Sequence, residues 1–547
     1  MKNRPAILFF LIFLSTTILS SCGLFQKPAP EPTSTPTVDE TASIFSVYLP
    51  PYIPGATQTY FFGEEYIRVI SAQDDADIRL DISATDPLFI WTYCLVGPFS
   101  SLNESVSSGD LLAFWEGDAD AWPDASKVYI DGSVKAVFEK IWGLASGQTI
   151  AESSASTILT DVWESENAFA IIPFESLEPQ WKVIAIDGIS PIDKSFEPEK
   201  YILNVPFGMA GDQQISNNFT AQLIAASSES YPIRNRNPEK MTTVAMTGVT
   251  ALVRGTAYVM EKSGYTYPAI DVGDILRTAD ILHISNEIPF TQTCPNPFAD
   301  AQKDENLVFC SKPAYIQLLE AIGTDVVEVT GDHFRDWGPE AMLQTLSLYD
   351  ERGWQYYGGG INFNDGIQPA LFEHNGNKIA FLGCNAKPKG YATAGEDYPG
   401  AVHCDFPVMA DEIKKVADEG YAPIFTFQHI EYYSYKRNDA LVEDFQAMAD
   451  AGAVIVSGSQ AHQPHAFEFY KTSYLHYGLG NLFFDQYKEG FAQRQSFIDQ
   501  HIFYDGKHIS TKLITLMFID LARPRLMTDD ERIDLLQIVF SASGWQY

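Results

Sequence analysis

The chain has 547 residues, 46% of them hydrophobic, and its 71 acidic residues outnumber its 36 basic residues to give a formal net charge of −35. This length leaves room for two to four domains with ordinary cores. So acidic a chain excludes nucleic acid as a broad partner, because carboxylates repel phosphates. The charge favours a body that attracts cations or basic substrates.

The first 22 residues have the pattern of an export signal. Lys2 and Arg4 precede an apolar run from Ala6 to Ile18, which is too short to cross a membrane comfortably. The next residues, Leu19 to Cys22, resemble the box at which bacterial lipoproteins are cleaved and acylated, and this resemblance implies lipidation of Cys22. We therefore expect an exported lipoprotein on the outer face of the cell membrane. Its lipid anchor at Cys22 would attach it to the membrane. An ordinary secretory signal with an incidental cysteine is the alternative.

Composition changes along the chain predict its segments. Residues 23–43 are rich in Pro, Thr and Ser, which is typical of a disordered tether. Strand and helix patterns begin at residue 44, and a polar run interrupts them. The predicted segments are a signal peptide with lipobox (1–22), a tether (23–43), a mixed α/β accessory domain (44–226), a linker (227–240), a second α/β domain (241–525) and a C-terminal tail (526–547).

Five cysteines follow Cys22. Export permits disulfides, and we expect the local pairs Cys294–Cys310 and Cys384–Cys404, with Cys94 free and buried. The spacings do not match a CxxC metal site.

The accessory segment 44–226 has mixed α/β patterns. Tyr66–Ile70 alternates as a strand does, and Ser133–Leu144 has apolar residues at helical spacing. From Ala168 to Pro191 the pattern resembles a lobe of the periplasmic solute-binding proteins, without a ligand signature.

Strands and helices alternate regularly from Thr243 to about Asp520. The predicted strands are Thr243–Met246, Asp280–Ile284, Asp325–Val329, Lys378–Leu382, Pro423–Phe427 and Ala453–Val456. The predicted helices are Ala314–Ile322, Glu340–Arg352, Val408–Glu419 and Ala440–Ala451. This alternation predicts a sheet with crossover helices on both faces, and the polar ends of its strands should gather at one rim.

Four polar clusters follow these strands. They are Ser285-Asn286-Glu287, Thr330–Asp336, Gln428–Glu431 and Gly458–His462. A single histidine here is better explained by a structural hydrogen bond. Four clusters in regular order favour a site, and their His, Asp, Glu and Asn side chains suit Mn²⁺, Fe or Zn²⁺, which can activate water and clamp a phosphoryl group.

The order of the motifs resembles that of a known family. The matching motifs are Thr247-Gly248-Val249 with Arg254-Gly255, Ser285-Asn286-Glu287, Gly331–Gly338, Tyr356–Gly360, Gln428–Tyr432, Gly458–Pro464 and Tyr477–Leu482. In these motifs, Thr243 to about Gln486 is similar to the CapA-type family of capsule or poly-γ-glutamate biosynthesis proteins, whose domain is related to the calcineurin-like metallophosphoesterases. The resemblance implies a layered α/β fold, a divalent metal, and a surface polymer or phosphoester as substrate.

The chain departs from the family pattern where metal ligands are expected. Val249 stands in the place of an Asp, Gln460 in the place of a His, and Asp332 replaces an Asn. We therefore expect at most one ion of Mn, Fe or Zn. The residues carried over as its ligands are Glu287, Asp332, His429, Glu431 and His462.

Other residues are carried over as catalytic or substrate-binding groups. His333 or His462 would stabilise the leaving group or act as general acid. Arg254, Asn286 and Asn481 would contact the substrate. The basic residues near the motifs are scattered, at Lys387, Lys389, Lys436 and Arg437, so a direct grip on a polyanion is not expected.

Three functions remain open at this point. The first is a lipid-anchored, metal-dependent hydrolase or transferase that acts on a phosphoester or surface polymer. The second is a non-catalytic component whose degenerate site binds a polymer or glycan. The third is a solute-binding lipoprotein whose N-terminal half carries the function. His333 and His462 favour the first function, and Val249 favours the second.

Overall fold

The computed structural model describes residues 44–83, 85, 87–226, 234–298, 307–390 and 392–547. The expected signal peptide, the Cys22 lipidation site, the tether and residues 227–233 of the expected linker lie outside the described residues. Within the described part of the chain, no helix is long and apolar enough to span a membrane. Phe45–Tyr547 form one compact unit.

The first part of this unit is built on a nine-stranded sheet with the order β2-β1-β3-β11-β4-β8-β6-β7, and β9 pairs with β4. The strands are β1 (Phe45–Tyr48), β2 (Ile67–Ile70), β3 (Ile78–Ile82), β4 (Phe89–Pro98), β6 (Lys127–Ile130), β7 (Ile150–Glu152), β8 (Ala168–Pro173), β9 (Trp181–Val183) and β11 (Asn204–Gly211). A separate short pair is β5 (Ser105–Val106) with β10 (Ala185–Ile186). The helices are α1 (Gly55–Gly63), α2 (Ser108–Glu116), α3 (Gly132–Trp142), α4 (Ile158–Trp163) and α5 (Gln213–Ala226). The predicted mixed α/β class is confirmed.

Helix α3 forms where its sequence pattern predicts it. The side chain of Asp131 accepts a hydrogen bond from the backbone N–H of Ser133 and so caps the first turn. Val134, Val137 and Phe138 lie on one face and are buried. The helix ends at Gly143, whose φ of 91° is easily adopted only by glycine.

The end of the expected linker packs against this first sheet. Asn235 Oδ1 accepts from the Thr92 N–H at 2.8 Å, and Asn235 Nδ2 donates to the Thr92 carbonyl at 2.8 Å. The buried Arg236 donates to the backbone carbonyls of Pro191 and Asp193. The polar composition of this stretch predicted a linker, and the side chains of Asn235 and Arg236 at its end bind backbone groups of the first part.

The second part of the chain contains two large sheets, whereas the alternation of strands and helices predicted a single sheet. The first sheet has the order β16-β15-β14-β12-β26-β27-β28, with β13 between β14 and β25. Its strands are β12 (Met241–Thr247), β13 (Val249–Thr250), β14 (Ile281–Asn286), β15 (Val326–Glu328), β16 (Gln355–Tyr357), β25 (Asn481–Phe483), β26 (Gln495–Tyr504), β27 (Lys507–Phe518) and β28 (Pro524–Leu526). Crossover patterns identify strands but do not say which strands pair, so the sequence did not separate the two sheets.

The second sheet has the order β18-β19-β21-β22-β24-β23. Its strands are β18 (Ala370–His374), β19 (Asn377–Asn385), β21 (Ala422–Gln428), β22 (Ile455–Ser457), β23 (Phe467–Tyr470) and β24 (Ser473–His476). A short separate pair is formed by β17 (Gly359–Gly360) and β20 (Gly400–Ala401).

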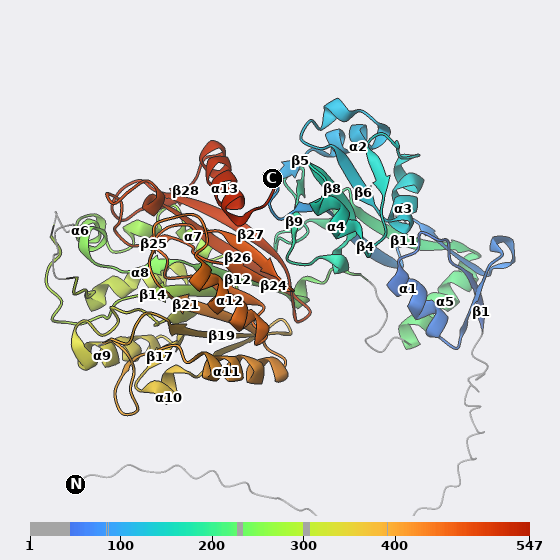
Figure 1. Ribbon diagram of the computed structural model, residues 1–547. Coiled ribbons are helices and arrows are strands. Elements are labelled where there is room, and N and C mark those ends of the chain that lie inside the picture. The colour runs from blue at the N-terminus through green and yellow to red at the C-terminus, as the bar shows by residue number, and fades with distance from the viewer. Residues whose placement is uncertain (1–43, 84, 86, 227–233, 299–306, 391) are drawn as a thin grey trace, which may run out of the picture. The chain divides into compact units, whose positions relative to one another are not determined.

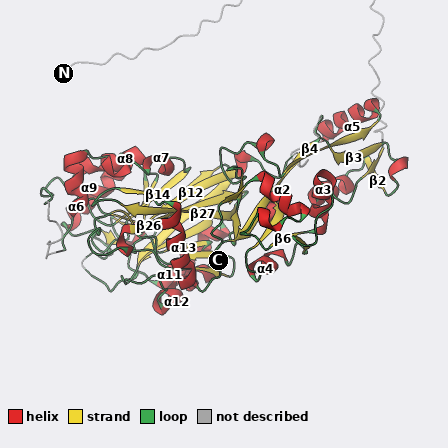
Figure 2. Cartoon of the chain, turned by 90° about the horizontal axis from the view of Figure 1, so that it is seen from above, coloured by secondary structure: helices red, strands yellow, loops and turns green. Residues whose placement is uncertain are grey.

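The two sheets share one apolar core, and helices cover their outer faces. Val244 and Met246 of β12 pack with Phe381 and Ile424 of the second sheet, while Ala245 faces the opposite way into a core with the helices. This alternation is the period of two that a strand imposes. The covering helices are α6 (Arg254–Ser263), α7 (Gly273–Leu276), α8 (Gln317–Ile322) and α9 (Gly338–Asp350) on the first sheet, and α11 (Phe406–Asp418) and α12 (Asp439–Asp450) on the second. Figure 2 shows these two helix layers on either side of the strands, and Figure 1 labels the individual elements.

The expected C-terminal tail contains a packed helix. Helix α13 (Asp529–Ser543) begins with a capping box formed by Thr528 and Glu531. It buries Leu535 and Phe540 in the core between the two sheets. A further short helix is α10 (Phe363–Gly366).

The expected cysteine pairing is confirmed. Cys294 is bonded to Cys310, and Cys384 is bonded to Cys404, while Cys94 is free and buried. The second disulfide lies at the end of β19, just before the loop that enters the site described below.

Candidate functional site

Polar residues from both sheets meet at the ends of their strands. Glu287 follows β14, and Asp332 and His333 follow β15, in the first sheet. Glu431 follows β21 and His462 follows β22, in the second sheet. Glu287 offers an oxygen within 4.8 Å of ligand atoms of Glu431 and His462, and likewise of Asp332 and His333. The structure therefore brings together five residues that the sequence placed at one rim.

Glu287 is the buried centre of this cluster. Glu287 is only 1% exposed. Neither of its carboxylate oxygens has a hydrogen-bond partner among the described residues. Burial raises the pKa of Glu287, and the imidazoles of His462 and His333 oppose that rise. A buried carboxylate without a hydrogen-bond partner costs folding free energy. Glu287 is therefore suited to binding a cation.

His462 is oriented by a neighbouring amide. Its Nδ1 lies 2.9 Å from Asn481 Oδ1, and Asn481 Nδ2 donates to the His462 carbonyl at 3.1 Å. The other ring nitrogen, Nε2, lies 3.9 Å from Glu431 Oε2. That separation is too long for a hydrogen bond, but it suits two ligands that each lie about 2 Å from one ion. The expected substrate contact Asn481 is thus buried and positions His462.

His333 forms a pair with a buried carboxylate. Its Nδ1 lies 2.8 Å from Asp336 Oδ2, which also accepts the Phe309 N–H at 2.7 Å. Burial alone would lower the pKa of His333, but the Asp336 hydrogen bond and the charges of Glu287 and Asp332 outweigh it and raise that pKa to about 9. In the metal-free protein this imidazole is therefore protonated at neutral pH.

The outer edge of the cluster is bridged by a lysine that the sequence analysis treated as incidental. Lys387 Nζ donates to Asp332 Oδ2 at 2.8 Å and to Glu431 Oε1 at 2.5 Å. Gln428 Nε2 donates to the other Asp332 oxygen at 3.0 Å. Despite burial, which would raise them, the pKa values of Asp332 and Glu431 are lowered, chiefly by Lys387 and the neighbouring histidines. Lys387 lies five residues after the predicted strand Lys378–Leu382, but the observed strand β19 continues to Asn385, so Lys387 follows its end closely.

Three expected site residues do not join the cluster directly. His429 Nε2 lies 2.8 Å from Asp444 Oδ2 in α12, and its Nδ1 accepts the Ile430 N–H. Asn286 turns toward the core, where its Nδ2 donates to the Tyr349 hydroxyl at 2.8 Å.

Arg254 is separated from the cluster by one layer of aromatic rings. Its guanidinium lies 6.0 Å from the Phe309 ring and 5.5 Å from the Phe484 ring. These two rings contact the imidazoles of His333 and His462 respectively. The proposed roles of Arg254, Asn286 and His429 remain predictions.

Two of the three departures from the family pattern bring in side chains with no carboxylate or imidazole. Val249 is fully buried in an apolar group with Ala251, Ile288, Phe309 and Phe484, so it adds a hydrophobic wall where a carboxylate was expected. The Gln460 amide donates to Ser285 Oγ at 2.6 Å, and its Oε1 has no hydrogen-bond partner among the described residues.

A buried network holds the loop that carries His462. Ser459 Oγ donates to Glu328 Oε2, and Thr330 Oγ1 donates to Glu328 Oε1 at 2.7 Å. His283 Nε2 lies 3.4 Å from Glu328 Oε2. These groups keep the pKa of the fully buried Glu328 low although burial would raise it. Glu328 thus ties the first sheet to the Gly458–His462 loop.

The donor set fits one divalent ion. Glu287, Glu431 and His462 supply the carboxylates and imidazole that Mn²⁺, Fe and Zn²⁺ accept. Val249 offers no ligand atom, and Lys387 already donates to Asp332 and Glu431.

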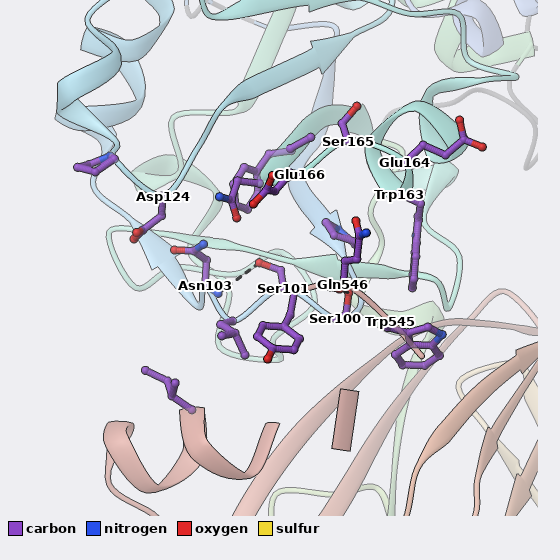
Figure 3. Close-up of a pocket in the computed structure, with 18 of the residues that line it drawn as sticks. Ser100, Ser101, Asn103, Asp124, Trp163, Glu164, Ser165, Glu166, Trp545 and Gln546 are labelled. Atoms are coloured by element: carbon purple, nitrogen blue, oxygen red, sulfur yellow. Dashed lines mark hydrogen bonds between the residues drawn. The ribbon is translucent and has the colours of Figure 1, made fainter. Parts of the chain in front are cut away.

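A larger pocket of about 690 Å³ lies elsewhere, between the end of β4 and the residues after α13. Figure 3 shows Trp163 and Trp545 on one side of it and the carboxylates Glu164, Glu166 and Asp124 around it. None of its lining residues is a histidine or cysteine, and none belongs to the candidate metal groups. The candidate metal-binding groups therefore lie in the small polar cluster and not in this pocket.

Comparison with known proteins agrees with the order of the motifs. Residues 243–486 match the family model described as "Bacterial capsule synthesis protein PGA_cap". The capsule biosynthesis protein CapA of Bacillus anthracis is 27% identical over 263 residues, which cover 47% of this chain and 62% of that protein. The PGA biosynthesis protein CapA of Bacillus subtilis is 29% identical over 190 residues, which cover 34% of this chain and 49% of that protein. The match thus spans less than two thirds of either relative.

Among solved structures, a putative 5′-nucleotidase from Staphylococcus aureus, in complex with alpha-ketoglutarate, is 11% identical. The similarity covers 54% of this chain and 58% of that chain, with a TM-score of 0.31. A likeness at that level supports no inference about activity. The similarity to known proteins rests on the sequence: residues 243–486 resemble the CapA-type family of bacterial capsule synthesis proteins.

Proposed function

We propose that this protein is a lipid-anchored hydrolase or transferase that uses one divalent metal ion in the biosynthesis or export of a capsule or poly-γ-glutamate type surface polymer. The observation that carries the proposal is the Glu287 carboxylate, which is buried and unpartnered among the described residues. It lies beside two imidazoles and two further carboxylates. The names of the relatives, which refer to capsule and PGA biosynthesis, support the polymer as substrate class.

Glu287, Glu431 and His462 are the residues that would hold the ion. Asn481 supports this role, because a hydrogen bond to one ring nitrogen of a histidine fixes the other nitrogen toward a metal. A divalent ion bound there acts as a Lewis acid, which polarises a phosphoryl or carbonyl oxygen.

His333 is the proposed general acid. Asp336 orients its ring through Nδ1, which leaves Nε2 to face the cluster. In the protein without an ion, the Asp336 hydrogen bond and the charges of Glu287 and Asp332 raise its pKa to about 9. With the ion bound, the hydrogen bond to Asp336 would still favour the protonated ring, which would donate a proton from Nε2 to the leaving oxygen of the substrate.

The proposed location of the protein is the outer face of the cell membrane. The apolar run before Cys22 and the Pro-rich stretch after it support a lipid anchor and a spacer. In a Cys22→Ala variant the protein should move from the membrane fraction to the soluble exported fraction. Retention of this variant in the membrane fraction would contradict the lipid anchor.

A second candidate function is favoured by the substitutions at the site. Val249 builds an apolar wall, and the side chain of Gln460 is hydrogen-bonded to Ser285. A site reduced in this way is compatible with a surface component that binds a polymer or solute without catalysis.

The two functions are separated by an activity screen on the purified full-length chain. The substrates are bis(p-nitrophenyl) phosphate, p-nitrophenyl phosphate and poly-γ-glutamate, each with Mn²⁺, Fe²⁺ or Zn²⁺. We expect turnover of at least one substrate and a loss of roughly 10²–10⁴-fold in His333→Gln. His374→Gln is the control, because His374 pairs with Asn377 at the start of β19 and contacts Thr242, whereas Lys387 follows the other end of that strand. Binding of poly-γ-glutamate without turnover under any condition would favour the second function.

A further inference from the structure

Lys387 places a positive charge between two carboxylates that belong to different sheets. Its Nζ donates to Asp332, which follows a strand of the first sheet, and to Glu431, which follows a strand of the second. The Lys387 side chain is 18% exposed, whereas both carboxylate side chains are 32% exposed. The ammonium group therefore lies beneath the rim rather than in open solvent.

The loop of Lys387 is fixed on both sides. The Lys387 backbone N–H donates to Asn385 Oδ1 at 2.9 Å, and Asn385 Nδ2 donates to the Thr330 carbonyl at 2.8 Å. This second bond links the loop to the segment that carries Asp332. Cys384, which immediately precedes Asn385, forms a disulfide with Cys404. Lys387 is consequently held at the site and is not a surface lysine that swings into it.

The ligand groups form two triads that share Glu287. One triad adds Glu431 and His462, and the other adds Asp332 and His333. A site with two metal ions places them about 3.5–4 Å apart, with acidic ligands shared or adjacent. Lys387 binds one carboxylate of each triad, so it neutralises charge at the position where a second ion would do so.

We infer that the ammonium group of Lys387 occupies the position of a second divalent ion in this site. The chain therefore binds only one divalent ion there. The apolar wall around Val249 agrees with this inference, because a second ion would lack a ligand on that side. The inference depends on the proposed function in one respect, which is that a first ion binds at Glu287 and His462.

The test is the Mn²⁺ stoichiometry and affinity of the full-length chain, measured by calorimetry and elemental mass spectrometry. The variants are Lys387→Met, which removes the charge, and Lys387→Arg, which keeps it. Lys389→Met is the matched control, because Lys389 lies two residues further along the same loop and is exposed. We expect one Mn²⁺ in the wild type, Lys387→Arg and Lys389→Met, and two in Lys387→Met.

The outcomes distinguish this inference from the proposed function. One Mn²⁺ in both the wild type and Lys387→Met, with equal Kd values, would overturn the inference and leave the proposed function standing. No Mn²⁺ in the wild type, together with one Mn²⁺ in Lys387→Met, would overturn the proposed function and leave the inference standing. No Mn²⁺ in either protein would overturn both.

A second variant covers the case in which Lys387→Met does not fold, since that change leaves Asp332 and Glu431 facing each other unpaired. The variant Lys387→Gln removes the charge but keeps an amide that can donate to Asp332 and Glu431. We expect it to bind one Mn²⁺ more than the wild type. Equal binding by a folded Lys387→Gln and the wild type would overturn the inference.

Discussion

The imidazole of His462 is held by Asn481, whose Oδ1 lies 2.9 Å from Nδ1 of the ring. The contact leaves Nε2 directed toward Glu431, at 3.9 Å from its carboxylate. Asn481 thus contributes to the site through the histidine that it orients, and its predicted contact with a substrate remains a prediction.

This relationship predicts the effect of removing the amide. In Asn481→Ala the Kd for Mn²⁺ should rise about 10–100-fold, as is typical when the partner of a metal-binding histidine is lost. Because Asn481 is fully buried, the free energy of unfolding should also fall by roughly 1–3 kcal/mol. The measurement is calorimetric titration below the unfolding temperature, with the exposed Asn364→Ala as control. An unchanged Kd in a folded Asn481→Ala would show that His462 does not need this orientation to bind metal.

The pair of His333 and Asp336 predicts a pH dependence of stability in the metal-free protein. The pKa of His333 is raised from 6.5 to about 9, so between these pH values the native state holds one proton more than the unfolded state. The stabilisation is complete below pH 6.5 and is lost as the pH rises through about 9. It should amount to roughly 1–3 kcal/mol.

Urea unfolding in EDTA at pH 6 and pH 9.5 tests this dependence. The difference in unfolding free energy between the wild type and His333→Gln should be larger at pH 6. The same difference at both pH values would show that His333 is not protonated in the native state.

The network around Glu328 predicts a structural role for Ser459. Removal of the Ser459 hydroxyl deprives a fully buried carboxylate of a donor and loosens the loop that carries His462. Ser459→Ala should lower the free energy of unfolding by roughly 1–3 kcal/mol, measured by chemical denaturation. Ser347→Ala, at an exposed position of α9, should change it by less than about 0.5 kcal/mol. Equal effects of the two substitutions would argue against the anchoring role.

Much of the fold could be read from the sequence because its periodic patterns are local. The pattern of Ser133–Leu144 predicted α3, and the apolar runs predicted β12, β19 and β21 close to their observed bounds. Strand pairing could not be read, since β12 pairs both with β14, where Val244 is opposite Ile281, and with β26, where Val244 is opposite His501 much later in the chain. The number of sheets depends on such long-range pairings and was therefore missed.

The site shows the same division between local and long-range information. Placement at strand ends was sufficient to bring Glu287, Asp332 and His462 to one rim. The partner of each side chain depends on three-dimensional packing: His429 contacts Asp444 of α12, and Lys387 bridges two sheets. Neither contact leaves a spacing pattern in the chain.

The central claim is that the cluster around Glu287 holds one divalent ion, and metal content tests it most directly. The experiment compares the full-length chain with Glu287→Gln and with the control Glu340→Gln. Glu340 is exposed in the first turn of α9. Each protein would be incubated with Mn²⁺, Fe²⁺ or Zn²⁺, desalted and analysed by elemental mass spectrometry. The account predicts about one equivalent in the wild type and in Glu340→Gln, and loss of that ion in Glu287→Gln. A wild-type protein that remains metal-free, or a folded Glu287→Gln that retains the full equivalent, would contradict it.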